Sequence, residues 1–374
     1  MIRARRLSGR AYSTAALILS LLAGGVATVP ASAAAPSMLA GFDGGTGWIN
    51  SVPLTPADLR GKVVLVDFWA YTCINCLRTL PYVRAWYDRY HTDGLTIVGV
   101  HTPEFDFEGD MANVNAAVKR LGVVWPVVLD DRQAIWNRYQ NDAWPKEYLF
   151  DQRGRLVDVQ TGEGNYQQTE AKIQELLKAS QPSLRLPAVM ALLPQDDYTK
   201  PGAVCYPQTN ETFVGPWHGS SVANQSSPSG AADLNYVDDP RANRDGSIYL
   251  QGHWRPTTHG EALVSGGSDG YLRLPYHAIQ VVVVMKPESG GAIRVKVTQD
   301  GKPVERADAG RDIRYDANGD SYVTVDAARA YELLMNARFG KHDLQLYPLR
   351  NGLGIYDFAF ESCEVSPSKN PASS

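Results

Sequence analysis

Two cysteines, Cys73 and Cys76, are separated by two residues and follow a long apolar run. At the start of a helix, residues three apart lie on one face, so their sulfurs can form a disulfide. Free N–H groups and the helix dipole at such a position stabilise a thiolate on the first cysteine. We therefore expect Cys73 to be the exposed nucleophile of a redox pair and Cys76 to be the deeper, resolving thiol.

A Cys-x-x-Cys pair can also supply half of a zinc site. The sequence contains neither a second such pair nor two histidines spaced to complete that site. His253 and His259 are six residues apart and have no evident third ligand. We therefore assign no metal and no cofactor, and we expect the pair to carry out dithiol–disulfide exchange.

The pair is expected to lie where a strand ends and a helix begins. Residues 63–69 are apolar except for Asp67, which predicts a strand buried on both faces, and residues 77–90 have a helical pattern. Further strands are expected over 95–100, 123–129, 148–150 and 156–159, and further helices over 113–121, 132–139 and 171–178. This alternation predicts an α/β domain with helices on both faces of its sheet.

The second half of the chain has a different pattern. Apolar residues alternate with Arg294 and Lys296 before a turn at Asp300-Gly301, and residues 280–285 are a candidate central strand. We expect an all-β domain, a sandwich or jelly roll, with one short helix over 327–336. The Asp316–Asp320 segment resembles a calcium loop but lacks its glycine and distal glutamate, so a hairpin turn is favoured.

The amino terminus has the pattern of an export signal. Four arginines within the first ten residues precede an apolar stretch over 15–29, and Ala31-Ser32-Ala33 is a small-x-small cleavage site. We expect a signal peptide over 1–33, an α/β domain over 38–180, a proline-spaced linker over 181–200, the β domain over 201–365 and a disordered tail over 366–374. The protein is then extracytoplasmic, in the periplasm or secreted, with retention by an uncleaved membrane anchor as the alternative.

Composition excludes several classes of protein. Of the 374 residues, 44% are hydrophobic and 20% charged, which is ordinary for a folded protein and excludes a disordered or fibrous chain. A formal net charge of −4 argues against a general nucleic-acid-binding protein, which usually carries a basic face.

The segment from Val66 to Cys76, Val-Asp-Phe-Trp-Ala-Tyr-Thr-Cys-Ile-Asn-Cys, resembles the active-site stretch of the thioredoxin superfamily. The resemblance implies that Asp67 is a buried acid that accepts the proton of the resolving thiol; a core carboxylate without a catalytic role is the alternative. It also implies that Trp144-Pro145 is a cis-proline bend facing the cysteines, which docks the substrate backbone. Trp69, Thr72 and Trp144 are then the expected substrate-binding residues, and Pro81 lies where the family kinks its active-site helix.

Within this superfamily the chain resembles the extracytoplasmic TlpA/ResA-like proteins, and more narrowly the thioredoxin-like and carboxy-terminal portions of DipZ. The similarity extends to Glu211–Gly215, Gly252–Trp254 and Val295–Pro303, which resemble the DipZ carboxy-terminal module, a jelly roll similar to carbohydrate-binding modules. It implies protein thiol or disulfide clients and a possible glycan on the second domain. DipZ-type proteins carry a membrane domain that delivers electrons, so a reductase lacking one requires a separate membrane donor of the CcdA/DsbD type.

An acidic-aromatic segment, Pro103–Glu108, also matches DipZ-like sequences. Its acids, Glu104 and Glu108, either tune Cys76 or contact a partner, or they belong to a solvated loop. Aromatic residues of the second half form either a sugar-stacking platform or part of the core: Trp217, Tyr236, Tyr249, Trp254 and Tyr271.

The two remaining cysteines flank the β region. Cys205 opens it and Cys363 lies near its end, so a structural disulfide between them is expected in an oxidising compartment, with two separate buried thiols as the alternative.

These observations favour an exported thiol–disulfide oxidoreductase that reduces protein disulfides. A peroxide-reducing redoxin is an alternative, because Thr72-Cys73 resembles a peroxidatic pair, although the usual proline and arginine context is missing. A sugar- or protein-binding jelly-roll protein with an inactive thioredoxin domain is the alternative from another class.

Overall fold

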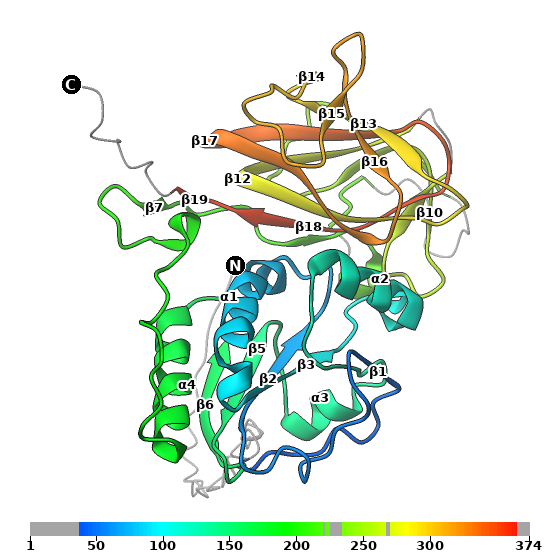
Figure 1. Cartoon of the computed structure of the whole chain (residues 1–374). Coiled ribbons are helices and arrows are strands. Elements are labelled where there is room, and N and C mark those ends of the chain that lie inside the picture. Colours follow the sequence, from blue (N-terminus) through cyan, green and yellow to red (C-terminus); the bar gives the residue numbers. More distant parts are fainter. Residues whose placement is uncertain (1–36, 220, 225–233, 267–269, 365–374) are drawn as a thin grey trace, which may run out of the picture. The chain divides into compact units, whose positions relative to one another are not determined.

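A six-stranded sheet organises the first half of the chain, with the strand order β1-β4-β3-β2-β5-β6 (Figure 1). The computed structural model describes residues 37–219, 221–224, 234–266 and 270–364. The strands are β1 (Gly47–Ile49), β2 (Val63–Trp69), β3 (Leu95–His101), β4 (Val127–Leu129), β5 (Lys146–Phe150) and β6 (Leu156–Thr161). β2, β3 and β4 run parallel, whereas β1, β5 and β6 pair antiparallel with their neighbours.

Four α-helices cover the two faces of this sheet. They are α1 (Ile74–Tyr90), α2 (Met111–Leu121), α3 (Ala134–Tyr139) and α4 (Tyr166–Ser180), with short 3-10 turns η1 (His91–Asp93) and η2 (Asp106–Gly109) between them. Buried residues of α1, α2 and α4 share one core with alternate residues of β2 and β3, and α3 packs in a second core on the other face. The expected α/β architecture with helices on both faces is confirmed.

The strands predicted from the sequence agree closely with β2, β5 and β6. Of the strand predicted over 123–129, only the end is a strand. Val123 and Trp125 lie in the connection before β4, where their carbonyl groups accept hydrogen bonds from the side chain of Asn50. Apolar residues at these positions are buried by helix packing and not by strand pairing.

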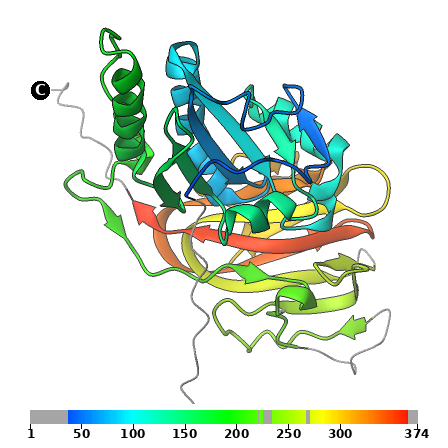
Figure 2. The ribbon, with the colours of Figure 1, turned by 90° about the horizontal axis from the view of Figure 1, so that it is seen from below.

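The second half is almost entirely β, as expected. Its strands are β7 (Val204–Cys205), β8 (Thr212–Phe213), β9 (Leu234–Tyr236), β10 (Tyr249–Pro256), β11 (Leu263–Ser265), β12 (Tyr271–Pro287), β13 (Ile293–Gln299), β14 (Lys302–Pro303), β15 (Arg314–Tyr315), β16 (Ser321–Val325), β17 (Arg329–Pro348), β18 (Leu353–Glu361) and β19 (Cys363–Glu364). Two further 3-10 turns are η3 (Pro194–Asp196) and η4 (Pro216–His218). The long strands β12, β17 and β18 lie side by side (Figure 2).

All strands of the second half except β7 and β19 form one antiparallel sheet that closes on itself. Its order is β15-β16-β13-β17-β12-β10-β11-β18-β8, and β12 also pairs with β18, which closes a small barrel through β10 and β11. The structure therefore confirms a mostly β domain, whereas a jelly-roll arrangement is not established by this topology.

The short helix expected over 327–336 is wrong, because these residues belong to β17. Ala330 to Met335 pair antiparallel with Gln280 to Val284 of β12, and Tyr331 and Leu333 are buried. The segment is rich in Ala, Glu, Leu and Met, which favour helices in isolation, but propensity is overridden when cross-strand pairing buries the chain.

Of the two roles considered for the aromatic residues of the second domain, a place in the core is confirmed for three of them. Tyr236, Tyr249 and Trp254 are buried in its core, so they cannot stack on a sugar together with Trp217, which is 61% exposed. By contrast, Asp316 accepts backbone hydrogen bonds in the tight turn between β15 and β16, as the hairpin interpretation requires.

Cys205 and Cys363 are directly opposite each other in the two-stranded β7–β19 pair and are joined by a disulfide. The described residues form one compact unit, and the 181–200 segment packs Leu184, Met190 and Leu193 against the core of the α/β half. Among the described residues, no helix combines the length and apolar character that crossing a membrane requires. The expected signal peptide over 1–33 and tail over 366–374 lie outside the described residues.

Candidate active site

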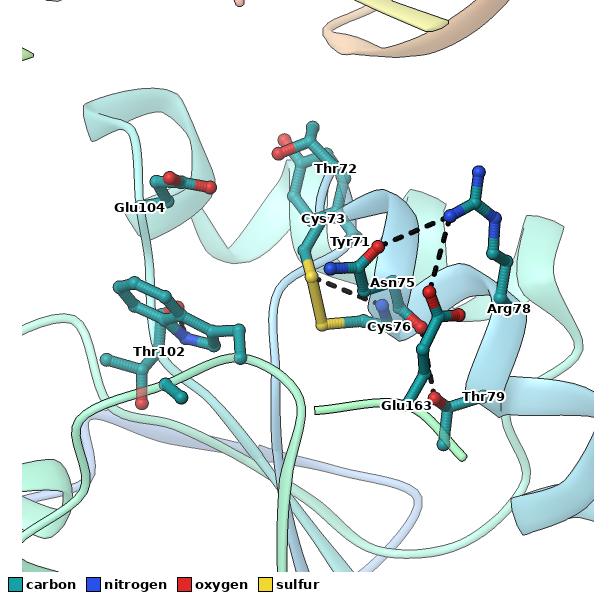
Figure 3. Close-up of a disulfide and its surroundings, with 12 residues drawn as sticks. Tyr71, Thr72, Cys73, Asn75, Cys76, Arg78, Thr79, Thr102, Glu104 and Glu163 are labelled. Atoms are coloured by element: carbon teal, nitrogen blue, oxygen red, sulfur yellow. Dashed lines mark hydrogen bonds and ion pairs between the residues drawn. A yellow bond between two sulfur atoms is a disulfide. The ribbon is translucent and has the colours of Figure 1, made fainter. Parts of the chain in front are cut away.

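Cys73 is the N-cap residue of α1 and is joined by a disulfide to Cys76, with Cα atoms 5.3 Å apart (Figure 3). The Sγ atom of Cys73 accepts a hydrogen bond from the Cys76 backbone N–H at 3.2 Å. A helix N-terminus stabilises negative charge on an acceptor in this position. Cys76 is buried and Cys73 is only partly buried, so the first sulfur is the more accessible of the two. The geometry suits a nucleophile followed by a resolving thiol.

A buried carboxylate fixes the backbone that precedes Cys73. One oxygen of Glu108 accepts hydrogen bonds from the Thr72 N–H at 3.1 Å and from its hydroxyl at 2.7 Å. The other oxygen accepts from the backbone N–H groups of Glu104 at 2.8 Å and Phe105 at 3.2 Å. Glu108 is fully buried, and this burial raises its pKa. Because Glu108 is not solvated, the alternative of a solvated loop is wrong at this position.

The residues just before the disulfide pack on a neutral histidine. His101, at the end of β3, accepts a hydrogen bond from the Tyr71 backbone N–H through Nε2 at 3.2 Å. Its ring is stacked on Tyr71 and meets the Trp69 indole edge-on. Burial lowers the pKa of His101 to about 3, so the ring is uncharged at neutral pH. These contacts pack the β2–α1 connection against the end of β3.

Two acids lie side by side in the centre of the sheet beneath the site. Asp67 of β2 and Glu147 of β5 are directly opposite each other, and each has one carboxylate oxygen with no hydrogen-bond partner. Both side chains are buried, which raises the pKa of Asp67, and burial together with the charge of Asp67 raises the pKa of Glu147. Two carboxylates this close and this buried favour holding a shared proton.

Arg78, one turn into α1, connects the dipeptide between the cysteines to the β domain. Its guanidinium contacts Asn75 Oδ1 and Glu163 Oε1, each at 3.4 Å (Figure 3). It also donates to Glu361 Oε2 at 3.0 Å and to Gln280 Oε1 at 2.6 Å. Glu361 in turn accepts the backbone N–H of Cys363 at 3.1 Å. Hydrogen bonds therefore join the neighbourhood of the first disulfide to that of the second.

The Trp144–Pro145 peptide bond is cis. The indole N–H of Trp144 donates to the Thr102 carbonyl at 3.1 Å, and the Pro145 carbonyl accepts from the Gly162 N–H at 2.9 Å. Thr102 lies near the disulfide on the side away from Arg78 (Figure 3). Trp144 and Cys73 pack against the same hydrophobic core. The bend is thus held by residues that directly follow β3 and β6.

Further acids gather around the Pro103–Glu108 segment. Burial, and then the like charges of Glu108, Glu211 and Glu261, raises the pKa of Glu104 to about 8. Burial raises the pKa of Glu261 to about 7, and its carboxylate accepts the Asp106 N–H at 3.0 Å. Both carboxyl groups are therefore protonated more readily than free ones.

Most of the expected site residues lie close to the Cys73–Cys76 disulfide, but they differ in how deeply they are buried. Trp69 and Thr72 are 1% and 2% exposed, so their side chains are buried, and their role in substrate binding stays a prediction. The sequence analysis missed Glu147, Arg78 and the contacts of Tyr71. Glu147 follows Lys146 at the start of β5 and does not interrupt an apolar run as Asp67 does, so no local signal marks it.

Comparison with known proteins shows which protein families the chain resembles. Residues 50–177 match the Redoxin family, and residues 209–360 match the thioredoxin-like C-terminal domain family. The chain is 37% identical over 292 residues to Protein DipZ of Mycobacterium bovis, covering 76% of this chain and 39% of DipZ. It therefore spans about two fifths of the length of the DipZ relatives that it matches.

Shorter similarities concern the first domain. The chain is 31% identical over 105 residues to the thiol-disulfide oxidoreductase ResA of Geobacillus thermodenitrificans, covering 28% of this chain and 58% of ResA. It also resembles the crystal structure of a thiol-disulfide isomerase from Corynebacterium glutamicum, with 23% identity, 38% of this chain and 96% of that chain covered, and a TM-score of 0.35.

Proposed function

Because the chain is a homologue of DipZ and of the thioredoxin-like thiol–disulfide oxidoreductases, we propose that it reduces protein disulfides by dithiol exchange at Cys73 and Cys76. The observation that carries this proposal is the disulfide at the N-terminus of α1, in which the Cys73 sulfur accepts the Cys76 N–H. The same contact stabilises a thiolate at Cys73 once the pair is reduced.

The reaction begins with the reduced pair. The Cys73 thiolate attacks one sulfur of the client disulfide, forming a mixed disulfide and releasing the other client sulfur as a thiolate. Cys76 then loses its proton and attacks the Cys73 sulfur, which forms the Cys73–Cys76 disulfide and releases the second client thiolate. The client gains two electrons, and a dithiol donor must return two electrons to the pair before the next turnover.

Asp67 and Glu147 are the groups proposed to take the Cys76 proton. Their raised pKa values place the loss of their shared proton nearer to neutral pH, where proton transfer from a thiol is reversible. Glu147 extends the role expected for Asp67 alone, because the two carboxylates are adjacent across the β2–β5 pair. The pair would store one proton during exchange and return it when the cysteines are reduced.

The proposed roles of the other expected site residues follow from where they lie in the fold. The cis bend at Trp144-Pro145 would face the client chain, whereas Trp69 and Thr72, being buried, would act as positioning residues beneath the disulfide. The arginine-rich and apolar start of the sequence supports export to an extracytoplasmic compartment, with a membrane dithiol donor of the CcdA/DsbD type. We also propose that the β domain is a jelly roll similar to carbohydrate-binding modules and that it binds a glycan.

Trapping the mixed disulfide tests the proposed reaction. Reduced Cys76→Ser protein, mixed with a disulfide-containing protein such as insulin, should accumulate a covalent complex through Cys73 that dithiothreitol releases. Cys73→Ser protein should form no such complex, and the wild type should turn over with dithiothreitol. Equal trapping by both single variants would contradict the assigned order of attack, and no trapping by either would remove the proposed function.

A further inference from the structure

A cavity of about 980 Å³ lies beside the active-site disulfide. Its apolar wall comes from Ile74, between the two cysteines, and from Leu77 and Pro81 farther along α1. The opposite wall comes from strands β12 and β17 and includes Ile279 and Met335, the latter 41% exposed. The cavity is therefore continuous with the dipeptide that separates the reactive sulfurs, and it extends over the face of the β domain.

Two polar groups in this cavity lack partners. The hydroxyl of Tyr71 is buried and makes no hydrogen bond, although Tyr71 lies two residues before Cys73. Arg120, at the end of α2, is exposed to the same cavity, and among the described residues no hydrogen bond or ion pair holds its guanidinium. An unsatisfied buried hydroxyl costs about 1–3 kcal/mol, so its retention beside an unpaired cation indicates a ligand that uses both.

The other cations of the cavity already have carboxylate partners. Arg311 pairs with Glu332 at 2.8 Å, and Arg329 pairs with Asp312 at 2.8 Å. Arg78 is held by Glu361, as described above. Burial, and then the like charge of Arg329, lowers the pKa of Arg120. The negative charge of Asp326 acts on Arg120, and Asp326 also accepts a hydrogen bond from the Tyr331 hydroxyl at 3.2 Å.

We propose that Tyr71 and Arg120 form a carboxylate-binding subsite for an acidic side chain of the client polypeptide, which lies extended in this cavity. A carboxylate would accept a hydrogen bond from the Tyr71 hydroxyl and a charge-assisted one from Arg120. Burial keeps the Tyr71 phenol protonated, because it raises the pKa of that group far above neutrality, so the hydroxyl remains a donor.

The cavity favours a polypeptide over a free small acid. Its volume is at the upper limit for small-ligand pockets, and a lone carboxylate would leave the walls formed by Leu77, Ile279 and Met335 uncovered. An extended chain presents side chains alternately, so one can reach Arg120 while its neighbours cover the apolar walls. The inference rests on the proposed function for its choice of a disulfide-bearing polypeptide.

Equilibrium binding tests the subsite without requiring turnover. Fluorescein-labelled nine-residue peptides with a central Ser in place of Cys are titrated into the oxidised full chain, with Asp, Asn or Lys placed in turn at each flanking position. At one position, the Asp peptide should bind about tenfold more tightly than the Asn peptide. Tyr71→Phe and Arg120→Gln should each bring this ratio close to one, and Arg120→Glu should favour Lys.

Matched controls separate the subsite from general effects. Tyr71→Phe keeps the ring stacked on His101 and removes only the unpartnered hydroxyl, so folding should be retained. Lys119→Gln removes a neighbouring exposed charge of α2 that is not part of the cavity lining, and it should keep the Asp preference. A preference that survives in Tyr71→Phe and Arg120→Gln would overturn the subsite, as would equal binding of all peptides.

Two further arms distinguish the sources of failure. Succinate that competes as strongly as the Asp peptide, or a soluble oligosaccharide that displaces it, would overturn a polypeptide occupant. Turnover of bis(2-hydroxyethyl) disulfide, which carries no charge, reports the proposed function separately. Turnover without any peptide preference refutes the subsite alone, whereas absence of turnover refutes the proposed function and leaves the binding ratio to decide the subsite.

Discussion

Glu108→Gln removes the carboxylate that holds the backbone before Cys73, and its cost can be worked from the four hydrogen bonds of Glu108. The amide of glutamine has one acceptor oxygen, which can serve the N–H groups of Glu104 and Phe105. Its NH₂ group then faces Thr72, whose hydroxyl can rotate to accept, but whose buried N–H loses its acceptor. One unsatisfied buried donor costs about 1–3 kcal/mol, so we expect the free energy of unfolding to fall by about 2 kcal/mol.

Urea denaturation of the oxidised protein, followed by tryptophan fluorescence, measures this loss, and amide hydrogen exchange at Thr72 localises it. Exchange should accelerate at Thr72 because its N–H has lost its acceptor. Iodoacetamide should also alkylate reduced Cys73 more slowly in the variant, because a loosened N-cap supports the thiolate less well. The cause of both effects is the same contact, so they should appear together.

A double-mutant cycle supplies the control. Thr72→Val removes the hydroxyl but keeps the backbone N–H, and combined with Glu108→Gln it should show a coupling energy of about 1 kcal/mol. Asp106→Asn changes an exposed acid of the same segment and should leave the Thr72 amide protected. A loss below about 0.5 kcal/mol with additive effects would refute the reasoning, because distant, independent sites behave that way.

Three other predictions concern stability and pH. The unfolded state ionises Glu104 near its ordinary pKa of 4.5, whereas the folded state keeps it protonated up to about 8; stability should therefore fall as pH rises through this interval, and Glu104→Gln should flatten the fall in pH-dependent urea melts. Asp67→Asn should raise the free energy of unfolding at pH 8 by about 1–3 kcal/mol, because it removes a buried carboxyl with a raised pKa, and it should slow release of the mixed disulfide in stopped-flow assays; unchanged release would argue for a structural role only. Removing the 158-residue cross-link with Cys205→Ser/Cys363→Ser should cost about 2–5 kcal/mol in the same melts, and an unchanged midpoint would mean that the β7–β19 pair holds without it.

The α/β half could be predicted closely because its signals are local. The seven residues of β2 are apolar except for Asp67, and α1 begins a few residues later with cysteines three apart at its start. Strand 329–348 could not be predicted, because residues 327–336 have a helical composition and only pairing with β12 makes them extended. That pairing joins segments about fifty residues apart, which no local pattern records.

The candidate site likewise combines residues that local sequence identifies with residues that only the fold brings together. Cys73 and Cys76 are specified by their spacing, whereas Glu108 acquires its role only when a segment 36 residues away folds back on Thr72. Glu147 and Asp67 meet through strand register, and Tyr71 and Arg120 through the arrangement of a loop and a helix end around one cavity. Contacts between distant segments determine which polar groups are buried, and burial sets their chemistry.

The reduction potential of the Cys73–Cys76 pair tests the central claim most directly. Wild-type protein and Cys205→Ser/Cys363→Ser protein are equilibrated in dithiothreitol redox buffers, and the free thiols are alkylated and counted by mass. We predict a reversible two-electron couple near about −270 mV in both proteins, as suits a reductase. A couple near about −120 mV would reverse the direction to disulfide formation, and the absence of a reversible couple would contradict dithiol exchange at this site.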